Sequence, residues 1–158
     1  MHKKPIILLV LAIAVGFSDA IFKHLALRFL PSEQSAVLKP IITLAVHRNP
    51  GIAFDIPLPL VIVLPITLGL IAGSGYLALK RWHTQRIQAI LAFTAIIGAI
   101  GNGFDRFING FTTDYLILFK TSAINLSDVL ILIGVLGFVW YDKHLPNPDQ
   151  QQTTSQDS

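Results

Sequence analysis

Long runs of apolar residues alternate with short polar segments along most of the chain. A helix that crosses a bilayer needs roughly 20 mainly apolar residues. Four runs approach that length, at about 5–22, 58–79, 87–104 and 126–141. The second run contains Pro59 and Pro65, which helices in lipid tolerate because neighbouring helices satisfy the freed backbone groups. The pattern therefore predicts an all-α membrane protein with four transmembrane helices.

The segments between the runs predict a small amount of other structure. Residues 39–54 are rich in Ile, Val, Thr and Phe with Pro and Gly punctuation, which is typical of short strands and turns. Residues 103–124 form the second long connection. Residues 146–158 are too polar to pack and are predicted to be a disordered tail. We find no internal repeat, so residues 1–145 are predicted to form a single membrane domain.

The first run has a second interpretation as a cleaved signal peptide, because Lys3 and Lys4 precede it. The run continues to Asp19 and Lys23 without a small-x-small cleavage site, which favours a span. With both termini cytoplasmic, Lys and Arg divide equally between the two sides, but the cytoplasmic segments are shorter and the turn from Lys80 to Arg86 has no acid. The positive-inside rule then favours cytoplasmic termini.

Composition supports a lipid-facing surface. Hydrophobic residues make up 53% of the chain and charged residues 13%, where a soluble domain has about 25% charged residues. The net charge of +3 is not arranged as a basic stripe with interleaved aromatic residues, so nucleic-acid binding is not expected. Cysteine is absent, which excludes disulfides, thiolate metal sites and a Cys nucleophile.

Polar residues next to the apolar runs are costly and are therefore candidates for function. Asp19 and Lys23 are four residues apart and can pair on one helix face; a structural ion pair at the membrane surface is the simpler alternative. Asn49 and Gly51 suit a turn in which an Asn amide both donates to and accepts from an extended peptide. Such a turn is also common without any function.

A third group follows the glycines of residues 98–103, which allow helices to approach closely in lipid. Asn102 and Arg106 are four apart and share a helix face. Asp105 could simply form a capping ion pair with Arg106. Together, however, these three side chains bring more polarity to the end of an apolar run than packing requires.

The last group contains Asp114, Asn125 and Asp128. Asp128 opens the last run, where an Asp is often only a helix cap, whereas Asp114 has no charged partner nearby in the sequence. Two carboxylates in a poorly solvated site cannot both ionise, so they share a proton. The ionised member can then activate water while the neutral one donates to a scissile carbonyl. The sequence places both at one membrane face but does not show that they meet.

Other kinds of active site are poorly supported. The chain has no G-x-S-x-G nucleophile motif, and its five His residues lack metal-ligand spacing. It also has no phosphate-binding loop or dinucleotide fingerprint. No metal and no organic cofactor are therefore expected.

In order along the chain, these groups resemble lipoprotein signal peptidase, the type II signal peptidase of bacteria. The matching pieces are Asp19 with Lys23, Asn49-x-Gly51-x-Ala53-Phe54, Gly98-Ala99-Ile100-Gly101-Asn102-x-x-Asp105-Arg106, Gly110-x-x-x-Asp114, and Asn125-x-x-Asp128. The chain departs from the usual family pattern at Pro50, Thr113, Tyr115, Ile124 and Ser127. None of these changes removes a titrating group, so they affect the shape of the pocket more than its chemistry.

The resemblance implies an aspartic endopeptidase with Asp114 and Asp128 as its catalytic dyad. It implies that Asn49, Gly51, Asn102, Arg106 and Asn125 hold the substrate backbone or order the dyad, and that Asp19 and Lys23 support the site. The implied fold adds a small extracytoplasmic β-cradle, expected at 39–54, and a short amphipathic helix, expected at 23–30. Which Asp is the general base is left open.

The substrate implied by the resemblance is a diacylglyceryl-modified prolipoprotein, cut just before its lipidated Cys. The enzyme would be a monomer in contact with membrane lipid in the bacterial cytoplasmic (inner) membrane, with its active site near the extracytoplasmic face. Two other classes stay open. A proton- or ion-coupled carrier would use Asp19, Asp105, Asp114 and Asp128 as a relay, and a non-catalytic assembly subunit would tolerate amides in place of its carboxylates.

Overall fold

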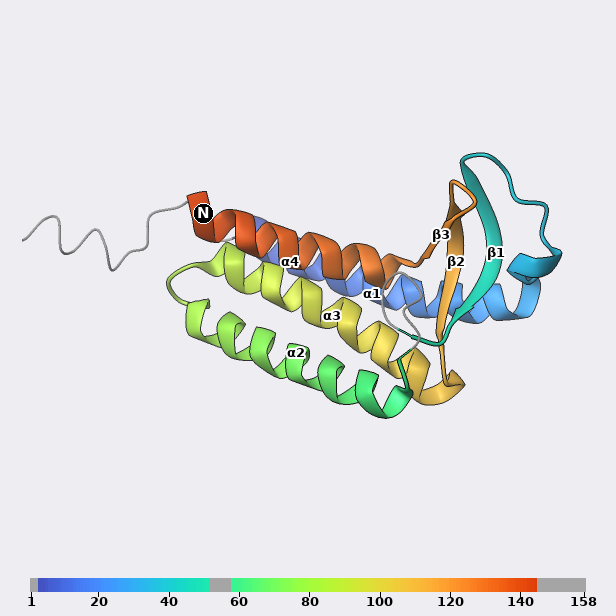
Figure 1. Ribbon diagram of the computed structural model, residues 1–158. Coiled ribbons are helices and arrows are strands. Elements are labelled where there is room, and N and C mark those ends of the chain that lie inside the picture. The colour runs from blue at the N-terminus through green and yellow to red at the C-terminus, as the bar shows by residue number, and fades with distance from the viewer. Residues whose placement is uncertain (1–2, 52–57, 145–158) are drawn as a thin grey trace, which may run out of the picture.

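The computed structural model describes residues 3–51 and 58–144. It contains four long helices: α1 (Lys3–Phe29), α2 (Leu60–Arg81), α3 (Arg86–Asn109) and α4 (Leu126–His144). The helices lie side by side, and a small sheet covers one end of the bundle (Figure 1). The start of α1, the end of α4 and the α2–α3 turn lie together at the other end (Figure 1). The predicted tail and residues 52–57 lie outside the described residues.

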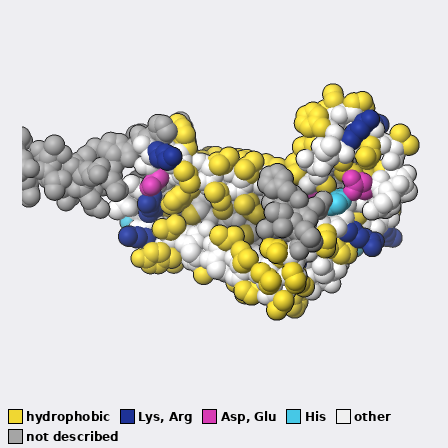
Figure 2. Space-filling view, viewed as in Figure 1, with side chains coloured by type: hydrophobic (Ala, Val, Ile, Leu, Met, Phe, Trp, Pro, Cys, Tyr) yellow, Lys and Arg dark blue, Asp and Glu magenta, His cyan; other side chains and the backbone are white. Residues whose placement is uncertain are grey.

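On the face that Figure 2 shows, apolar side chains cover the middle of the bundle and charged side chains gather at its two ends. In the part of the chain that the structure describes, three helices are long and apolar enough to cross a membrane: α1 from Pro5 to Phe29, α2 and α3. Large apolar side chains on them face outward, including Phe17 at 70% and Leu68 at 65% exposure. Such exposure is unfavourable in water and appropriate in lipid. The fourth apolar run, predicted at 126–141, falls on the 19 residues of α4, which has Asp128 in its first turn and Asp142 and Lys143 near its end.

The prediction of a separate helix at residues 23–30 was wrong. These residues are the last turns of α1, which runs without interruption to Phe29. No Gly or Pro interrupts the chain between Phe17 and Leu30, and Pro31 then disfavours helical geometry in the residue before it. Between α1 and the sheet the structure has only a single 3₁₀ turn, Glu33–Ser35.

Helix α3 lies at the centre of the bundle and packs against α1, α2 and α4. Small side chains line its buried face, which is why α4 approaches so closely. A Cβ at Gly98 would lie 2.4 Å from the carbonyl oxygen of Ser127, and one at Gly134 would lie 2.5 Å from the backbone nitrogen of Ala95. The same face of α3 continues into the buried polar residues Asn102, Asp105 and Arg106.

The sheet has three antiparallel strands in the order β1 (Ile42–Asn49), β2 (Thr112–Leu118) and β3 (Ser122–Ile124). Only β1 lies in the segment where strands were predicted; β2 and β3 come from the second connection, which was predicted only as a loop. Gly110 ends α3 in the left-handed conformation with φ of 79°, and its N–H donates to the carbonyl of Arg106. Strand β2 therefore starts directly above the polar end of α3.

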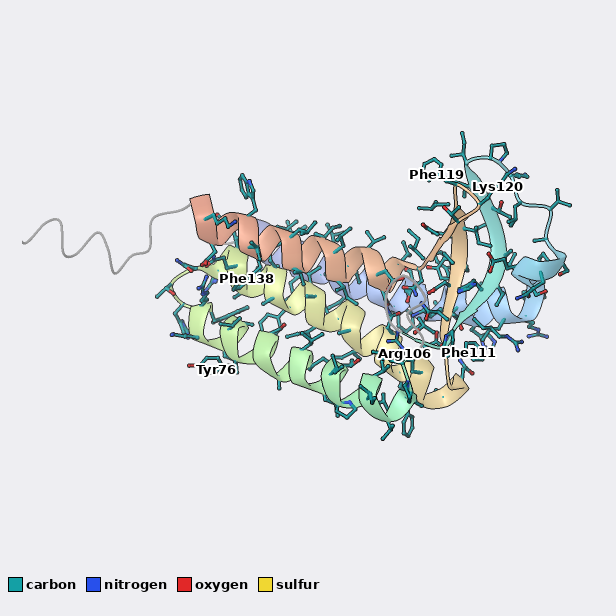
Figure 3. The ribbon with its side chains drawn as sticks, viewed as in Figure 1. Tyr76, Arg106, Phe111, Phe119, Lys120 and Phe138 are labelled. Carbon is teal, nitrogen blue, oxygen red and sulfur yellow. The ribbon has the colours of Figure 1, made fainter. Side chains whose placement is uncertain are left out.

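The two ends of the sheet differ in character. Where β2 begins, His47 of β1 lies opposite Asp114, and the His47 ring pairs with Glu33 of the 3₁₀ turn. At the other end, Phe119 and Lys120 form the turn between β2 and β3 with φ of 51° and 64° (Figure 3). Non-glycine residues rarely adopt this left-handed conformation, so the turn is strained.

Candidate active site

The nine residues selected from the sequence lie together where the bundle meets the sheet. They come from five parts of the fold: the last turns of α1, the end of β1 and the residues after it, the end of α3, the strand β2, and the start of α4. Figure 3 places Arg106 at the end of α3 nearest the sheet. The nine are Asp19, Lys23, Asn49, Gly51, Asn102, Arg106, Asp114, Asn125 and Asp128.

Asn125 links the two carboxylates that the sequence suggested as a dyad. Its Nδ2 donates to Asp114 Oδ1 at 2.5 Å, and its backbone N–H donates to Asp128 Oδ2 at 3.1 Å. The N–H of Asp128 donates in return to Asn125 Oδ1 at 2.9 Å. Because Oδ1 must face that N–H, only Nδ2 can face Asp114. One buried amide therefore fixes the relative positions of both carboxylates.

The environments of the two carboxylates differ. Asp114 is 1% exposed on β2, whereas Asp128 is partly exposed in the first turn of α4. Burial, reinforced by the charge of Asp128, raises the pKa of Asp114 from 3.8 to about 7, against hydrogen bonds from Asn125 and Asn49 that lower it. Asp114 can therefore carry a proton near neutral pH beside a second carboxylate that water can reach.

A chain of polar contacts connects Asp128 to α1. Asn102 Nδ2 donates to Asp128 Oδ1 at 2.7 Å, and Lys23 Nζ donates to Asn102 Oδ1 at 2.7 Å. Lys23 also pairs with Asp19 at 2.8 Å and lies 3.8 Å from Asp105. Both members of the Asp19–Lys23 pair are buried. The pair is therefore an ion pair in the interior of the protein and is not exposed on its surface.

Asp19 is the acceptor at the centre of this interior network. Its Oδ1 accepts from the Tyr115 hydroxyl at 2.8 Å and from the Leu126 N–H at 2.9 Å, and its Oδ2 accepts from the Ser127 hydroxyl at 2.6 Å. Burial and the hydrogen bond to Asp19 raise the pKa of Tyr115 above its ordinary value, so its hydroxyl stays a donor. Asp19 thereby ties α1 to β2 and to the start of α4.

Gly51, just after β1, is held near Asp114 by a second set of contacts. Arg106 Nη2 donates to the Gly51 carbonyl at 2.9 Å, and the Gly51 N–H donates to Asn49 Oδ1 at 2.9 Å. This fixes the Asn49 amide so that its Nδ2 faces Asp114 Oδ2, at 3.3 Å. Among the described residues, Arg106 Nε is buried without a hydrogen-bond partner.

Sequence reasoning missed several residues of this network. Tyr115 and Ser127 were noticed only as departures from a family pattern, although both donate to Asp19. Asp105 was considered a capping partner of Arg106; instead it accepts from the Thr113 N–H at 2.6 Å and from Asn109 Nδ2 at 2.6 Å, which anchors β2 to α3. The only available signal was the unusual density of short polar side chains between 102 and 128.

Comparison with known proteins agrees with this arrangement. The family described as signal peptidase (SPase) II matches residues 11–142. A lipoprotein signal peptidase from Thermodesulfovibrio yellowstonii is 31% identical over 77% of this chain and 84% of its own. One from Sinorhizobium fredii is 32% identical over 82% and 81%. One from Synechocystis is 37% identical over 49% of this chain, spanning 46% of its own length.

The fold also has counterparts among solved structures. A bacterial membrane enzyme determined at 1.9 Å resolution superposes with a TM-score of 0.72, at 19% identity, over 93% of this chain and 96% of that one. A second, determined at 2.3 Å, gives a TM-score of 0.70 over 86% of this chain and 85% of that one. The family matches most of the sequence, and the likeness in fold agrees with that match. This chain therefore belongs to the signal peptidase II family.

Proposed function

We propose that this protein is a membrane-embedded aspartic endopeptidase that removes signal peptides from diacylglyceryl-modified prolipoproteins, cutting just before the lipidated Cys. The observation that carries the proposal is the pair formed by Asp114 and Asp128, linked through one amide, with Asp114 holding a proton near neutral pH. In a chain of the signal peptidase II family, such a pair supplies both the acid and the base that peptide hydrolysis requires.

In the proposed mechanism Asp128 is the base. It is the more exposed of the two, so water can reach it, and the N-terminal end of α4 favours its negative charge. Asp128 takes a proton from water, and the hydroxide oxygen attacks the scissile carbonyl carbon. Buried Asp114 gives its proton to the carbonyl oxygen. As the carbon–nitrogen bond breaks, Asp128 returns its proton to the leaving amine of the lipidated Cys, and Asp114 takes a proton back from one of the two hydroxyls on the carbon, which leaves a carboxylic acid.

The groups around the dyad suit a peptide in extended conformation. Arg106 Nε is a buried donor without a hydrogen-bond partner among the described residues, and such a group is normally satisfied. A substrate carbonyl is a fitting acceptor. Asn49 and Asn102 order the dyad through their amides, whereas Asp19 and Lys23 support Asn102 and do not act on the substrate.

We propose that all four helices span the bacterial cytoplasmic (inner) membrane, with both termini in the cytoplasm and the dyad near the extracytoplasmic face. The charged residues of α4 lie at its two ends, which leaves an apolar stretch from Val129 to Tyr141 between them. Residues 1–145 form one membrane domain followed by a polar tail. The nine site residues meet within a single chain, so the proposed enzyme acts as a monomer. The four acids of the alternative relay, Asp19, Asp105, Asp114 and Asp128, gather at one end of the bundle, which argues against a relay across the membrane.

The test uses the purified full-length protein in detergent with two substrates, a diacylglyceryl-modified prolipoprotein and the same protein with an unmodified Cys. We expect cleavage of the lipidated form only, followed as a mass shift on a gel. Asp114→Asn and Asp128→Asn should each abolish cleavage while the protein stays folded. Asp142→Asn, at the opposite end of the bundle, is the matched control and should cleave normally. Near wild-type cleavage by either dyad variant would refute the assignment.

A further inference from the structure

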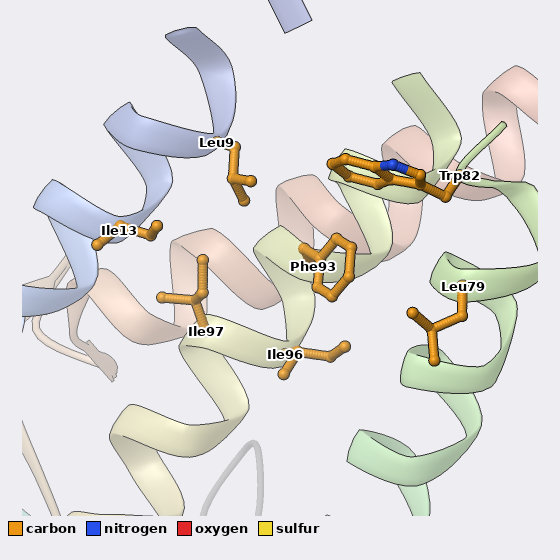
Figure 4. A pocket seen from close by; sticks show the side chains of 7 residues that line it. All are labelled: Leu9, Ile13, Leu79, Trp82, Phe93, Ile96 and Ile97. Carbon is orange, nitrogen blue, oxygen red and sulfur yellow. The ribbon is translucent and has the colours of Figure 1, made fainter. Parts of the chain in front are cut away.

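An apolar groove lies at the end of the bundle opposite the dyad, and the proposed reaction does not use it. Helices α1 and α2 pack on α3 from different sides. Between them lies a groove of about 420 Å³ with seven hydrophobic lining residues (Figure 4). This volume lies within the range of ligand-binding pockets. The lining residues are Leu9, Ile13, Leu79, Trp82, Phe93, Ile96 and Ile97.

Positive charge stands beside this groove. The guanidinium of Arg86 lies 5.5 Å from the centre of the Trp82 ring, and that ring meets Phe93 edge-on at 5.9 Å. Lys80 follows the lining residue Leu79 directly and is exposed. Arg81 points elsewhere, because it donates to Gln88 at 2.7 Å and pairs with Asp142 of α4. Arg86, at the ring of Trp82, and Lys80, next to Leu79 in the chain, are therefore the described cations that can serve the groove.

The chemistry of the groove selects its occupant. A purely apolar ligand gains little by leaving surrounding lipid for an apolar groove, because there is no hydrophobic driving force inside a bilayer. Specific binding must come from the cations at its side, and basic pockets between transmembrane helices bind anionic lipid headgroups. We infer that the groove holds an acyl chain of one anionic phospholipid, with Lys80 and Arg86 at its headgroup phosphate. This inference does not rest on the proposed cleavage reaction.

The two tryptophans of the chain provide a reporter and its control. Trp82 lines the groove. Trp140 lies on α4 near the same end of the bundle and is 60% exposed. The full-length Trp140→Phe and Trp82→Phe variants, each with one tryptophan, are placed in phosphatidylcholine vesicles. A small fraction of the lipid is brominated, as either phosphatidylglycerol or phosphatidylcholine, and fluorescence quenching is measured. With one or two cations at the headgroup, we expect brominated phosphatidylglycerol to quench Trp82 roughly 5- to 30-fold more effectively than brominated phosphatidylcholine does. Trp140 should not distinguish the two lipids.

Two pairs of variants in the Trp140→Phe background separate the groove from general lipid contact. Ile13→Phe fills the groove, and Leu11→Phe is its control, since Leu11 lies on the same helix with a similar exposure, 54% against 53%. Arg86→Gln removes a cation at the groove, and Lys143→Gln removes one at the end of α4. Ile13→Phe should bring the preference of Trp82 for the anionic lipid close to one. Arg86→Gln leaves Lys80 in place and should lower the preference roughly 5-fold. The two controls should leave it unchanged.

Three results would overturn the inference. If the two brominated lipids quench Trp82 equally in the protein whose groove and cations are intact, only bulk lipid reaches the groove. A preference that survives both Ile13→Phe and Arg86→Gln would place the anionic lipid elsewhere. Protection of Trp82 from both brominated lipids would mean that something other than a phospholipid, such as an apolar peptide helix, fills the groove.

Discussion

The proton on Asp114 has a consequence for stability that can be measured separately from activity. Asp114 is 1% exposed, and its pKa rises from 3.8 to about 7 in the folded protein. A carboxyl group with a raised pKa binds its proton more tightly when folded than when unfolded. Its favourable contribution is therefore complete below about pH 4 and is lost as the pH rises towards 7. Replacing Asp114 by Asn removes this dependence, because the amide does not titrate.

The size of the effect follows from the two pKa values. Each pH unit between them costs about 1.4 kcal/mol, so the wild type loses about 2–3 kcal/mol of unfolding free energy between pH 5 and pH 8 through this group. The amide carries a constant cost. Asn125 and Asn49 both present Nδ2 donors to position 114, so one donor would face another, at about 1–2 kcal/mol. The variant should therefore be close to wild type at pH 5 and about 2–3 kcal/mol more stable at pH 8.

The assay is unfolding of wild type and Asp114→Asn in the same detergent at pH 5, 6, 7 and 8, followed by tryptophan fluorescence. Asp142→Asn is the control, because it removes an exposed carboxylate at the opposite end of the bundle, and an ordinary carboxyl is already ionised throughout this range. Its difference from wild type should not change with pH. A stability difference for Asp114→Asn that stays constant from pH 5 to pH 8 would refute the argument that the fold keeps this carboxyl protonated.

Three further outcomes follow from the packing and the polar network. Lys23→Met should cost about 3–5 kcal/mol of unfolding free energy, because it leaves the buried carboxylate of Asp19 without its cation. The loss should be smaller in the double variant with Asp19→Asn, and unfolding of the single and double variants measures both. Gly98→Ala should destabilise the protein by about 1–3 kcal/mol, since the added Cβ would lie 2.4 Å from a backbone oxygen of α4. Gly73→Ala is the control, because an added Cβ there has nothing within 4 Å. Equal thermal midpoints for the two variants would contradict this. Lys120→Gly should stabilise by up to about 1 kcal/mol by relieving the left-handed turn, and a lower thermal midpoint would show that the turn is not strained.

Much of the fold could be read from local patterns. The apolar runs predicted α1, α2 and α3 as membrane-spanning candidates, with starts within about two residues of those observed. Most of the site could be predicted for a related reason: polar side chains beside apolar runs must satisfy one another, so Asp19, Asn102, Arg106 and Asp128 were worth singling out. Each of these side chains makes a polar contact with another part of the chain in the structure.

The rest depends on contacts between distant parts of the sequence. Strand β2 pairs with β1 from Ile42↔Leu118 to Asn49↔Thr112, more than sixty residues away, and no local pattern specifies that register. The donors to Asp19 are equally remote, since the Tyr115 and Ser127 hydroxyls lie 96 and 108 residues further along the chain. The length of α1 was underestimated because Lys23 looked like the end of a span, although it is buried inside the bundle.

The charges around the site explain why the dyad should hold a proton. Among the described residues, the lysine and arginine side chains set against Asp19, Asp105, Asp114 and Asp128 are Lys23 and Arg106, and His47 lies opposite Asp114 on β1. Lys23 is committed to Asp19 at 2.8 Å and reaches Asp128 only through the amide of Asn102. An amide passes on a hydrogen bond but brings no charge. A cation at position 102 would favour two ionised carboxylates and would remove the acid that peptide cleavage needs. In the proposed mechanism, the neutral Asn102 therefore lets a buried lysine order Asp128 while leaving the proton of the Asp114 and Asp128 pair in place.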